Sequence, residues 1–213
     1  MSAEMRVRPT FDEENHLIRQ GYRFIAGIDE VGRGPLAGPL IAAAVILPPD
    51  LDTPWLSLVR DSKQLTANMR ARLFPLIGEA AVAIGIGSCP HKIIDAIGIA
   101  QATRFAMSAA IAHLYLHPDF LLIDYVKLPK IAIPQKSIVK GDSSCISIAC
   151  ASIIAKVVRD RLMVDMDQVH PGYGFAHHKG YATREHLESL RRLGACPIHR
   201  KCFSPVRACL DRR

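Results

Sequence analysis

The sequence lacks a hydrophobic run long enough to cross a bilayer. Its longest apolar stretch, Leu40–Leu47, stops at Pro48-Pro49, whereas a membrane-spanning helix needs about 20 apolar residues. Residues 1–15 mix charges and contain no apolar segment of the kind that secretory signal peptides carry. We therefore expect a cytoplasmic protein that does not bind membranes.

The chain also lacks a disulfide framework, an internal repeat and any low-complexity segment. Two of its 6 cysteines, Cys145 and Cys150, fall in an apolar helical pattern, where cysteine behaves as a small hydrophobic residue. Four residues of zinc-ligand type lie near the C-terminal end, at Cys196, His199, Cys202 and Cys209. Their spacing matches no standard zinc motif, so we expect reduced structural thiols, and the zinc alternative stays open.

There is no acidic excess, and the basic excess is unevenly placed. The formal net charge is +7. From Arg184 to the end there are eight Lys or Arg residues and three acids, so this segment carries most of the positive charge. A basic end on a nearly balanced body is typical of a protein that binds nucleic acid. A solvated basic helix and tail would have the same composition.

The 213 residues fit one domain, or one domain with a small appendage. Apolar runs of strand length are Tyr22–Ile28, Leu40–Leu47, Ala80–Gly87, Phe120–Ile123 and Ile138-Val139. Helical spacing or capping is found over Thr66–Gly78, over Ile93–Leu116 and from Ile146 onward. Strands first and strand–helix alternation afterwards predict an α/β sheet of mixed direction.

Acidic residues stand at the ends of these elements. Asp29 and Glu30 follow the first apolar run and precede the turn Gly32-Arg33-Gly34, Asp124 follows another run, and Asp142 precedes the long helix. If the two strands are neighbours, these carboxylates meet at one sheet edge. They cannot all stay ionised there without cations, and oxygen ligands favour Mg²⁺ or Mn²⁺. Two such ions are the usual machinery of phosphodiester cleavage.

Each acid also has a simpler interpretation. Asp142 could cap its helix, and Asp124 could be a turn residue. Asp29 and Glu30 cannot both point inward from a regular strand, because successive side chains alternate between faces. Either the strand bends there, which Gly32 and Gly34 would permit, or Glu30 reaches round the edge.

The motifs around these acids resemble those of the type 2 ribonuclease H family, in particular its bacterial ribonuclease HII branch. The similar segments follow in order: Gly27–Pro39, Asp61–Thr66, Asp124, Lys140–Asp142, Ile148–Val157, Arg159-Asp160, Tyr173–Phe175, His178–Thr183 and His199-Arg200. The resemblance therefore spans about Phe24 to Val206. It implies a ribonuclease H-like mixed five-stranded sheet flanked by helices, with a C-terminal helical extension.

The resemblance also implies a domain plan and an activity. Residues 1–183 would form the catalytic domain, with 1–20 as an N-terminal extension, and 184–213 would form a basic helical extension. The expected activity is endonucleolytic hydrolysis of the RNA strand in RNA–DNA hybrids, with nicking on the 5′ side of a lone ribonucleotide in duplex DNA. The products would carry 3′-hydroxyl and 5′-phosphate ends.

Residue roles follow from the same resemblance. The four metal-binding acids would be Asp29, Glu30, Asp124 and Asp142, with Asp29 bridging two ions. The backbone of Gly32, Arg33 and Gly34 would approach the ribose 2′-hydroxyl, and Tyr181 would stack on the next sugar. Phosphates would be held by Lys63, Lys179, Arg200 and the rest of the C-terminal cations.

Three positions depart from the family pattern. One is Cys150 in the long helix, where alanine is more usual. Tyr125 follows the third acid, where glycine is usual, and Cys202 stands where serine is usual. We expect a monomer. The alternatives left open are another nuclease on the same carboxylate scaffold and a non-enzymatic basic binder of nucleic acid. The choice between Mg²⁺ and Mn²⁺, and the docking of a sliding clamp on the tail, are not decided by the sequence.

Overall fold

Five strands form one mixed sheet on which the helices are assembled. The computed structural model describes residues 8–211, so residues 1–7 of the expected N-terminal extension and 212–213 of the expected C-terminal one lie outside the described residues. The strands are β1 (Ile25–Val31), β2 (Leu40–Ile46), β3 (Ala83–Cys89), β4 (Phe120–Asp124) and β5 (Gln135–Ile138), in the spatial order β3-β2-β1-β4-β5. The pairs β1–β2 and β2–β3 are antiparallel, and β1–β4 and β4–β5 are parallel. The predicted mixed five-stranded sheet is confirmed.

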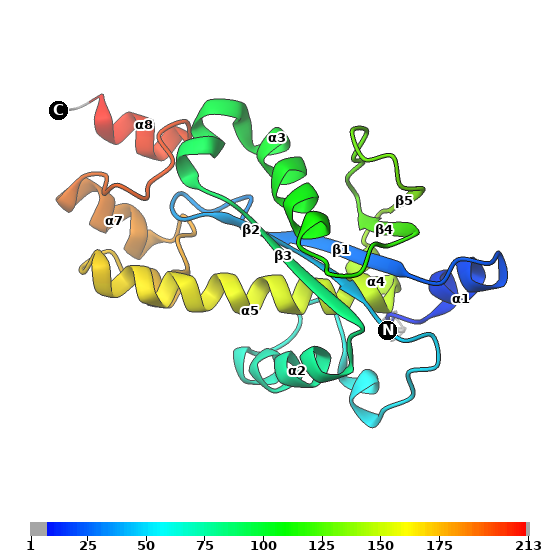
Figure 1. Cartoon of the computed structure of the whole chain (residues 1–213). Coiled ribbons are helices and arrows are strands. Elements are labelled where there is room, and N and C mark those ends of the chain that lie inside the picture. Colours follow the sequence, from blue (N-terminus) through cyan, green and yellow to red (C-terminus); the bar gives the residue numbers. More distant parts are fainter. Residues whose placement is uncertain (1–7, 212–213) are drawn as a thin grey trace, which may run out of the picture.

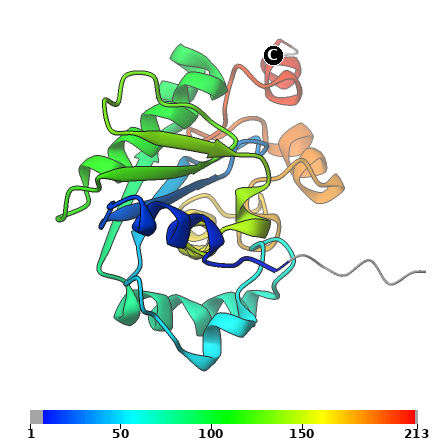
Figure 2. The ribbon, with the colours of Figure 1, turned by 90° about the vertical axis from the view of Figure 1, so that its right-hand side faces the viewer.

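Helices cover both faces of this sheet (Figure 1). They are α1 (Asp12–Arg19), the 3₁₀ helix η1 (Pro54–Leu58), α2 (Ala67–Ala80), α3 (His91–Ala112), α4 (Gly141–Ser144), α5 (Ile146–Val169), α6 (Phe175–His178), α7 (Arg184–Leu193) and α8 (Ser204–Leu210). One face packs against α3, and the other packs against α5 with α2 beyond it (Figure 2). The helices α7 and α8 lie at the opposite end of the molecule from α1 (Figure 1).

The alternation of side chains along β2 explains why its sequence is apolar throughout. Leu40, Ala42, Ala44 and Ile46 belong to the core against α3, while Ile41, Ala43 and Val45 belong to the core against α5. A strand covered on both faces has no solvated side, and its sequence therefore shows no polar alternation.

A glycine lets α5 approach β1 closely. A Cβ at Gly27 would lie 2.2 Å from the backbone carbon of Ser147 and 2.4 Å from the nitrogen of Ile148. These distances are too short for any other residue, so the backbone of α5 rests directly on β1 at this point. The start of α5 and the short helix α4 before it are thereby held beside the strand that carries Asp29.

Three strands differ in their bounds from the apolar runs that predicted them. The strand β3 begins three residues later than Ala80–Gly87, β5 begins three residues earlier than Ile138-Val139, and β1 is shifted toward the C-terminus. The strand β1 begins and ends three residues later than the apolar run Tyr22–Ile28, because its pairing with β2 continues to Val31 opposite Ile41. The predicted capping of α2 by Thr66 is confirmed, since its hydroxyl accepts from the N–H of Met69 at 3.2 Å. Within residues 8–211 no helix is both long and apolar enough to span a bilayer.

Candidate active site

A cleft of about 780 Å³ opens at the ends of β1 and β4. Its lining includes eight of the residues expected at the site, namely Glu30, Gly32, Arg33, Gly34, Lys63, Asp124, Asp142 and Tyr181. Asp29 lies just behind it and is buried, with 4% of its surface exposed. Segments far apart in the chain therefore supply a single site.

Asp29 and Glu30 lie within β1 and do not follow it, which corrects the expectation drawn from the apolar run. They pair with Ala43 and Ala42 of β2. Side chains directly opposite in an antiparallel pair lie on the same face, so Asp29 faces α5 and Glu30 faces the α3 side. The strand does not bend. Glu30 reaches the cleft from the other face, and its carboxylate lies 3.5 Å from the guanidinium of Arg33.

The environment of Asp29 disfavours its negative charge. Burial raises the pKa of this carboxyl well above its ordinary value, and the charges of Glu30 and Asp124 raise it further. Hydrogen bonds from the Ser152 hydroxyl and the N–H of Glu30 act in the opposite direction without compensating. A cation close to such a group favours its charged form.

Asp124 and Asp142 meet through the turn between β5 and α4. The N–H of Gly141 donates to Asp124 Oδ1 at 2.7 Å. Asp142 lies in the one-turn helix α4, and the break at Cys145 separates it from α5, so Asp142 does not directly precede the long helix as expected. Among the described residues its side chain caps neither helix. Burial, and then the charges of Asp61 and Asp124, raise the pKa of Asp142.

Lys63 lies among these carboxylates. Its ammonium is 3.6 Å from Asp142 Oδ2. Partial desolvation acts to lower the pKa of Lys63, but the attraction of Asp142, Asp61 and the neighbouring acids outweighs it and raises that pKa. Asp61 is a further acid that lines the cleft, two residues before Lys63. The resemblance covers it within Asp61–Thr66, but the sequence analysis gave it no role at the site. Its position in an irregular segment gave no periodic signal.

The donor set suits a hard divalent cation, although the carboxylates do not already surround a common point. Within residues 8–211 no three His, Cys, Asp or Glu side chains are grouped so that they could hold an ion as they stand. The ammonium of Lys63 is the cation that the acids face instead. Glu30 Oε2 is buried and has no hydrogen-bond partner among the described residues. An unpaired buried carboxylate oxygen and raised carboxyl pKa values both fit a group that completes its coordination with Mg²⁺ or Mn²⁺.

Two buried arginines hold the loop after β1 from behind. Arg200 donates to the carbonyls of Gly32 at 2.7 Å, Arg33 at 3.1 Å and Gly38 at 3.0 Å. Arg159 donates to the carbonyls of Pro39, Ala37 and Lys179. Arg200 has no exposed surface, so the expectation that it holds a phosphate is corrected. Burial, and then the charge of Arg159, lower its pKa to about 9, and it remains charged at neutral pH.

The position of Arg200 also orients two N–H groups. In a trans peptide the C=O and N–H point in opposite directions. Because the carbonyls of Gly32 and Arg33 point back to Arg200, the N–H groups of Arg33 and Gly34 point away from it. Neither N–H has a hydrogen-bond acceptor within the part of the chain that the structure describes. Both residues line the cleft, which thus presents free backbone donors beside the carboxylates.

Gly32 is required by this arrangement. Its φ is +95°, in the region that favours glycine, and a Cβ there would lie 2.3 Å from the Nε of Arg159. The two loop glycines do not bend the strand, which was one of the two expected possibilities. Gly32 lets the chain leave β1 and pass over Arg159, whereas a Cβ at Gly34 would meet only the Tyr181 ring.

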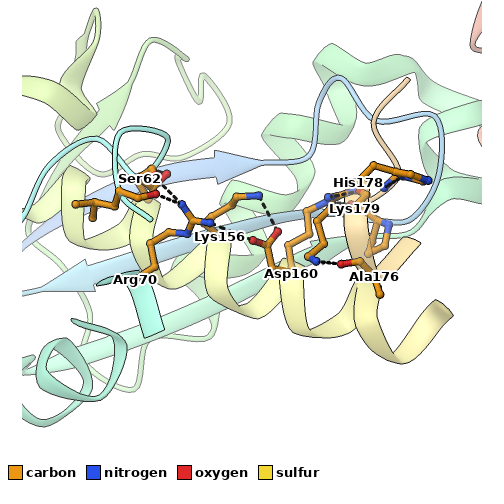
Figure 3. Close-up of polar contacts among 12 residues, drawn as sticks. Ser62, Arg70, Lys156, Asp160, Ala176, His178 and Lys179 are labelled. Carbon is orange, nitrogen blue, oxygen red and sulfur yellow. Dashed lines mark hydrogen bonds and ion pairs between the residues drawn. The ribbon is translucent and has the colours of Figure 1, made fainter. Parts of the chain in front are cut away.

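Of the two remaining substrate-binding candidates, Tyr181 lines the cleft and Lys179 does not. The ammonium of Lys179 turns back to the carbonyl of Ala176 in its own turn, and this residue does not line the cleft (Figure 3). Tyr181 is 40% exposed and lies at the mouth of the cleft. A Cβ at Gly34 would be 3.7 Å from its ring, so Tyr181 stands next to the free N–H donors.

A polar network along α5 adds residues that the sequence reasoning did not single out for the site. The Ser62 hydroxyl contacts that of Ser152 at 2.8 Å, and Arg70 donates to the carbonyl of Ser62 (Figure 3). Lys156 lines the cleft and donates to Asp160 at 2.7 Å. Ser152 and Lys156 are four residues apart and therefore lie on one face of α5. This spacing is the sequence pattern from which both residues could have been placed at the site. The network anchors the segment that carries Lys63.

The residues of zinc-ligand type are buried or half-buried, and two of them, Cys196 and His199, belong to a cluster of buried histidines. His199 Nε2 contacts His186 Nε2 at 3.1 Å, and its Nδ1 lies 3.1 Å from the Sγ of Cys196. His186 stacks on His178 with ring centroids 4.4 Å apart. All six cysteines are free thiols, and no metal-binding group is found among residues 8–211. The backbone N–H of Cys202 donates to Asp95 at 2.9 Å. Cysteine in place of serine at this position leaves that backbone hydrogen bond intact.

This cluster predicts a loss of stability in weak acid. Burial, followed by the neighbouring His186, lowers the pKa of His199 to about 4 from 6.5. The unfolded chain therefore takes up a proton before the folded protein does, and stability is lost as the pH falls from about 6.5 toward 4. The expected loss between pH 7.5 and 4.5 is about 2–3 kcal/mol.

Urea unfolding of wild type and His199→Asn at the two pH values isolates this contribution, because other titrating groups act in both proteins. The wild type should lose about 2–3 kcal/mol more than the variant. Equal losses would show that His199 takes up its proton equally readily in the folded and unfolded chain.

Comparison with known proteins agrees with this geometry. The sequence profile of the family described as Ribonuclease HII matches residues 26–206. The chain is 53% identical over 205 residues to a Ribonuclease HII of Dehalococcoides mccartyi, covering 96% of this chain and 97% of that one. It also superimposes on ribonuclease H2 of Pyrococcus horikoshii OT3, with a TM-score of 0.73, 25% identity and coverage of 88% and 97%.

A further similar structure is the RNase HII of Archaeoglobus fulgidus, solved as a PCNA:RNase HII complex. The TM-score is 0.72 at 26% identity, with 86% of this chain and 96% of that one covered. The matched residues 26–206 contain all four acids, the Gly32-Arg33-Gly34 loop and Tyr181. This chain belongs to the ribonuclease HII family of endoribonucleases.

Proposed function

We propose that this endoribonuclease hydrolyses the RNA strand of RNA–DNA hybrids and also nicks duplex DNA on the 5′ side of a single embedded ribonucleotide. The products carry 3′-hydroxyl and 5′-phosphate ends. One observation carries the proposal. The outward N–H groups of Arg33 and Gly34 lie in the same cleft as the carboxylates. Only a ribonucleotide has a 2′-hydroxyl for such donors to recognise next to the reacting phosphate.

The proposed cofactor is one or two Mg²⁺ or Mn²⁺ ions held by Asp29, Glu30, Asp124 and Asp142. When bound, such ions supply an activated water and stabilise the leaving 3′-oxygen. The protein contributes an all-oxygen ligand set, and burial and mutual repulsion disfavour the negative charge of these acids when no metal ion is bound. Lys63 is exposed along most of its side chain and is free to move from Asp142 to a substrate phosphate.

A cleavage panel tests the proposal. Matched duplexes that are all DNA, RNA–DNA hybrid, or DNA with one ribonucleotide are incubated with Mg²⁺ or with Mn²⁺, and the product ends are mapped. We expect cleavage of the second and third duplexes only. Cleavage of all-DNA duplexes would indicate a different nuclease, and binding without cleavage would indicate a non-enzymatic nucleic-acid binder.

Tyr181 is proposed to read the junction between ribose and deoxyribose. Replacing it by alanine removes the ring beside Gly34 that would stack on the following sugar. We expect Tyr181→Ala to reduce kcat/KM for single-ribonucleotide nicking by about 30-fold and hybrid cleavage by about threefold, since stacking on one nucleotide contributes about 1–3 kcal/mol. Tyr181→Phe, which keeps the ring, is the control. Equal losses on both substrates would contradict the junction-reading role.

A sliding clamp is a proposed partner, supported by the Archaeoglobus fulgidus relative solved with PCNA. The expected monomer and the clamp complex are tested together by size-exclusion chromatography with light scattering, using the full chain alone and mixed with clamp. A monomeric mass for the chain alone supports the expected monomer. Co-elution of the mixed sample supports the clamp as a partner, and separate elution contradicts that partnership.

A further inference from the structure

Tyr125 has an exposed aromatic ring without an intramolecular role. It directly follows Asp124, lines the cleft and is 65% exposed. Its backbone N–H donates to the carbonyl of Ile138. Within residues 8–211 its side chain makes no hydrogen bond, ion pair or ring contact. Stability of the fold therefore gives no reason for a large aromatic side chain at this position.

The backbone at Tyr125 is also in an unfavourable conformation. Its φ is +56°, in the left-handed region that a bulky residue rarely adopts. Glycine would fit here without strain, and a tyrosine is nonetheless present. Residues held in such conformations cluster at sites that bind ligands, where a functional contact compensates for the strain. Lys140, at φ +56°, lies on the same side of the cleft.

Tyr125 and Tyr181 lie on opposite sides of β1. The sheet order places β1 between β2 and β4. Tyr181 stands beside Gly34 in the β1–β2 connection, whereas Tyr125 stands at the end of β4, on the far side of Asp29 from that connection. The cleft is therefore lined by one exposed tyrosine on each side of Asp29 and Glu30.

We propose that Tyr125 contacts the substrate strand by stacking on the nucleotide that precedes the scissile phosphate, opposite the nucleotide that Tyr181 contacts. This inference rests on the proposed function, because the order of nucleotides follows from nicking on the 5′ side of the ribonucleotide. Aromatic rings stack on any base or sugar, so the contact adds affinity and places the strand without selecting sequence. Tyr125 is a substrate-contacting residue that touches none of the reacting atoms.

Four variants of the full chain test the proposal: Tyr125→Ala, Tyr125→Gly, Tyr125→Phe and, as a surface control, Val169→Ala. Val169 is 62% exposed at the end of α5 and does not line the cleft. Binding of a single-ribonucleotide duplex is measured in an Asp29→Asn background without added divalent ions, so that no cleavage is expected. The constants kcat and KM are measured in the protein that retains Asp29. The thermal unfolding temperature of each variant measures the effect of the left-handed backbone conformation at residue 125 on stability.

We expect Tyr125→Ala and Tyr125→Gly each to weaken binding and raise KM by roughly tenfold, with kcat within about twofold. Tyr125→Phe and Val169→Ala should match the parent protein. Tyr125→Gly should unfold at a higher temperature than Tyr125→Ala, which separates loss of strain from loss of the ring. Unchanged binding in both small-residue variants would overturn the proposal, as would weaker binding in Tyr125→Ala that Tyr125→Gly restores.

Which nucleotide Tyr125 contacts is tested with the fluorescent base 2-aminopurine, placed immediately before or after the scissile phosphate. Quenching at the preceding position that disappears in Tyr125→Ala supports the assignment, and quenching confined to the following position overturns it. Absence of wild-type cleavage in the substrate panel would refute the proposed function. Normal wild-type cleavage, together with unchanged binding in the Tyr125 variants, would refute this inference alone.

Discussion

Asp29→Asn is expected to lower kcat on an RNA–DNA hybrid by at least about a thousandfold while binding changes by less than about threefold. Asp29 is the most deeply buried of the four acids, and its charge interacts directly with those of Glu30 and Asp124. Asparagine keeps the size and the oxygen of the side chain but removes the charge that a divalent cation requires. Contacts to the phosphates from other residues remain.

The same substitution is expected to stabilise the metal-free protein. The pKa of Asp29 is raised in the folded state by burial and by Glu30 and Asp124. A raised carboxyl pKa means that the stability present in acid is lost as the pH rises through the folded-state value, so at neutral pH the charge destabilises the fold. Removing it should increase the free energy of unfolding by about 1–2 kcal/mol.

Urea unfolding in EDTA and in Mn²⁺ measures this effect, with Asp50→Asn as the matched control because Asp50 is exposed and outside the cleft. Mn²⁺ should stabilise the wild type and the control more than Asp29→Asn. Retained cleavage at normal rates in Asp29→Asn would refute the central role of this carboxylate.

Arg200→Met is expected to destabilise the protein by about 3 kcal/mol or more. The substitution leaves the buried carbonyls of Gly32 and Gly38, and the partly buried carbonyl of Arg33, without their donor. A buried acceptor that loses its partner costs about 1–3 kcal/mol. Because the same hydrogen bonds orient the N–H groups of Arg33 and Gly34, cleavage should fall about a hundredfold even under conditions where the variant is folded.

The neighbouring surface cation Lys201 provides the matched control, since Lys201→Met removes one charge from the exposed side of the same turn. The salt dependence of hybrid binding then separates two roles. Loss of a phosphate contact reduces the slope of log K against log salt by about one. Arg200→Met should leave that slope unchanged, and Arg200→Lys, which keeps the charge but not the three donors, should recover little activity. A reduced slope with normal stability would restore the phosphate-binding role.

The linear sequence was sufficient for the five strands and for the helices α2, α3 and α5, and it singled out acids that lie in or beside the cleft. The apolar run at Leu40–Leu47 and the cap at Thr66 are local signals, and each produced the predicted element. The proposal of a metal ion also follows from the residue types, because adjacent carboxylates in an apolar context repel each other and a cation favours their charged forms. Glycine beside them indicated a close approach of chain segments, which Gly27 and Gly32 both show.

Tertiary structure decided where charged groups point. Arg200 and Lys201 are adjacent cations in sequence, yet one is fully buried behind the loop and the other is exposed. Their difference arises from carbonyl groups about 160 residues earlier in the chain, which no local pattern encodes. The same holds for the faces of Asp29 and Glu30, which are fixed by pairing with β2, and for the approach of Lys63 to Asp142. Local residue types determine which chemistry is available, whereas long-range packing and hydrogen bonding determine which atoms meet, because those contacts join segments that are distant in the chain.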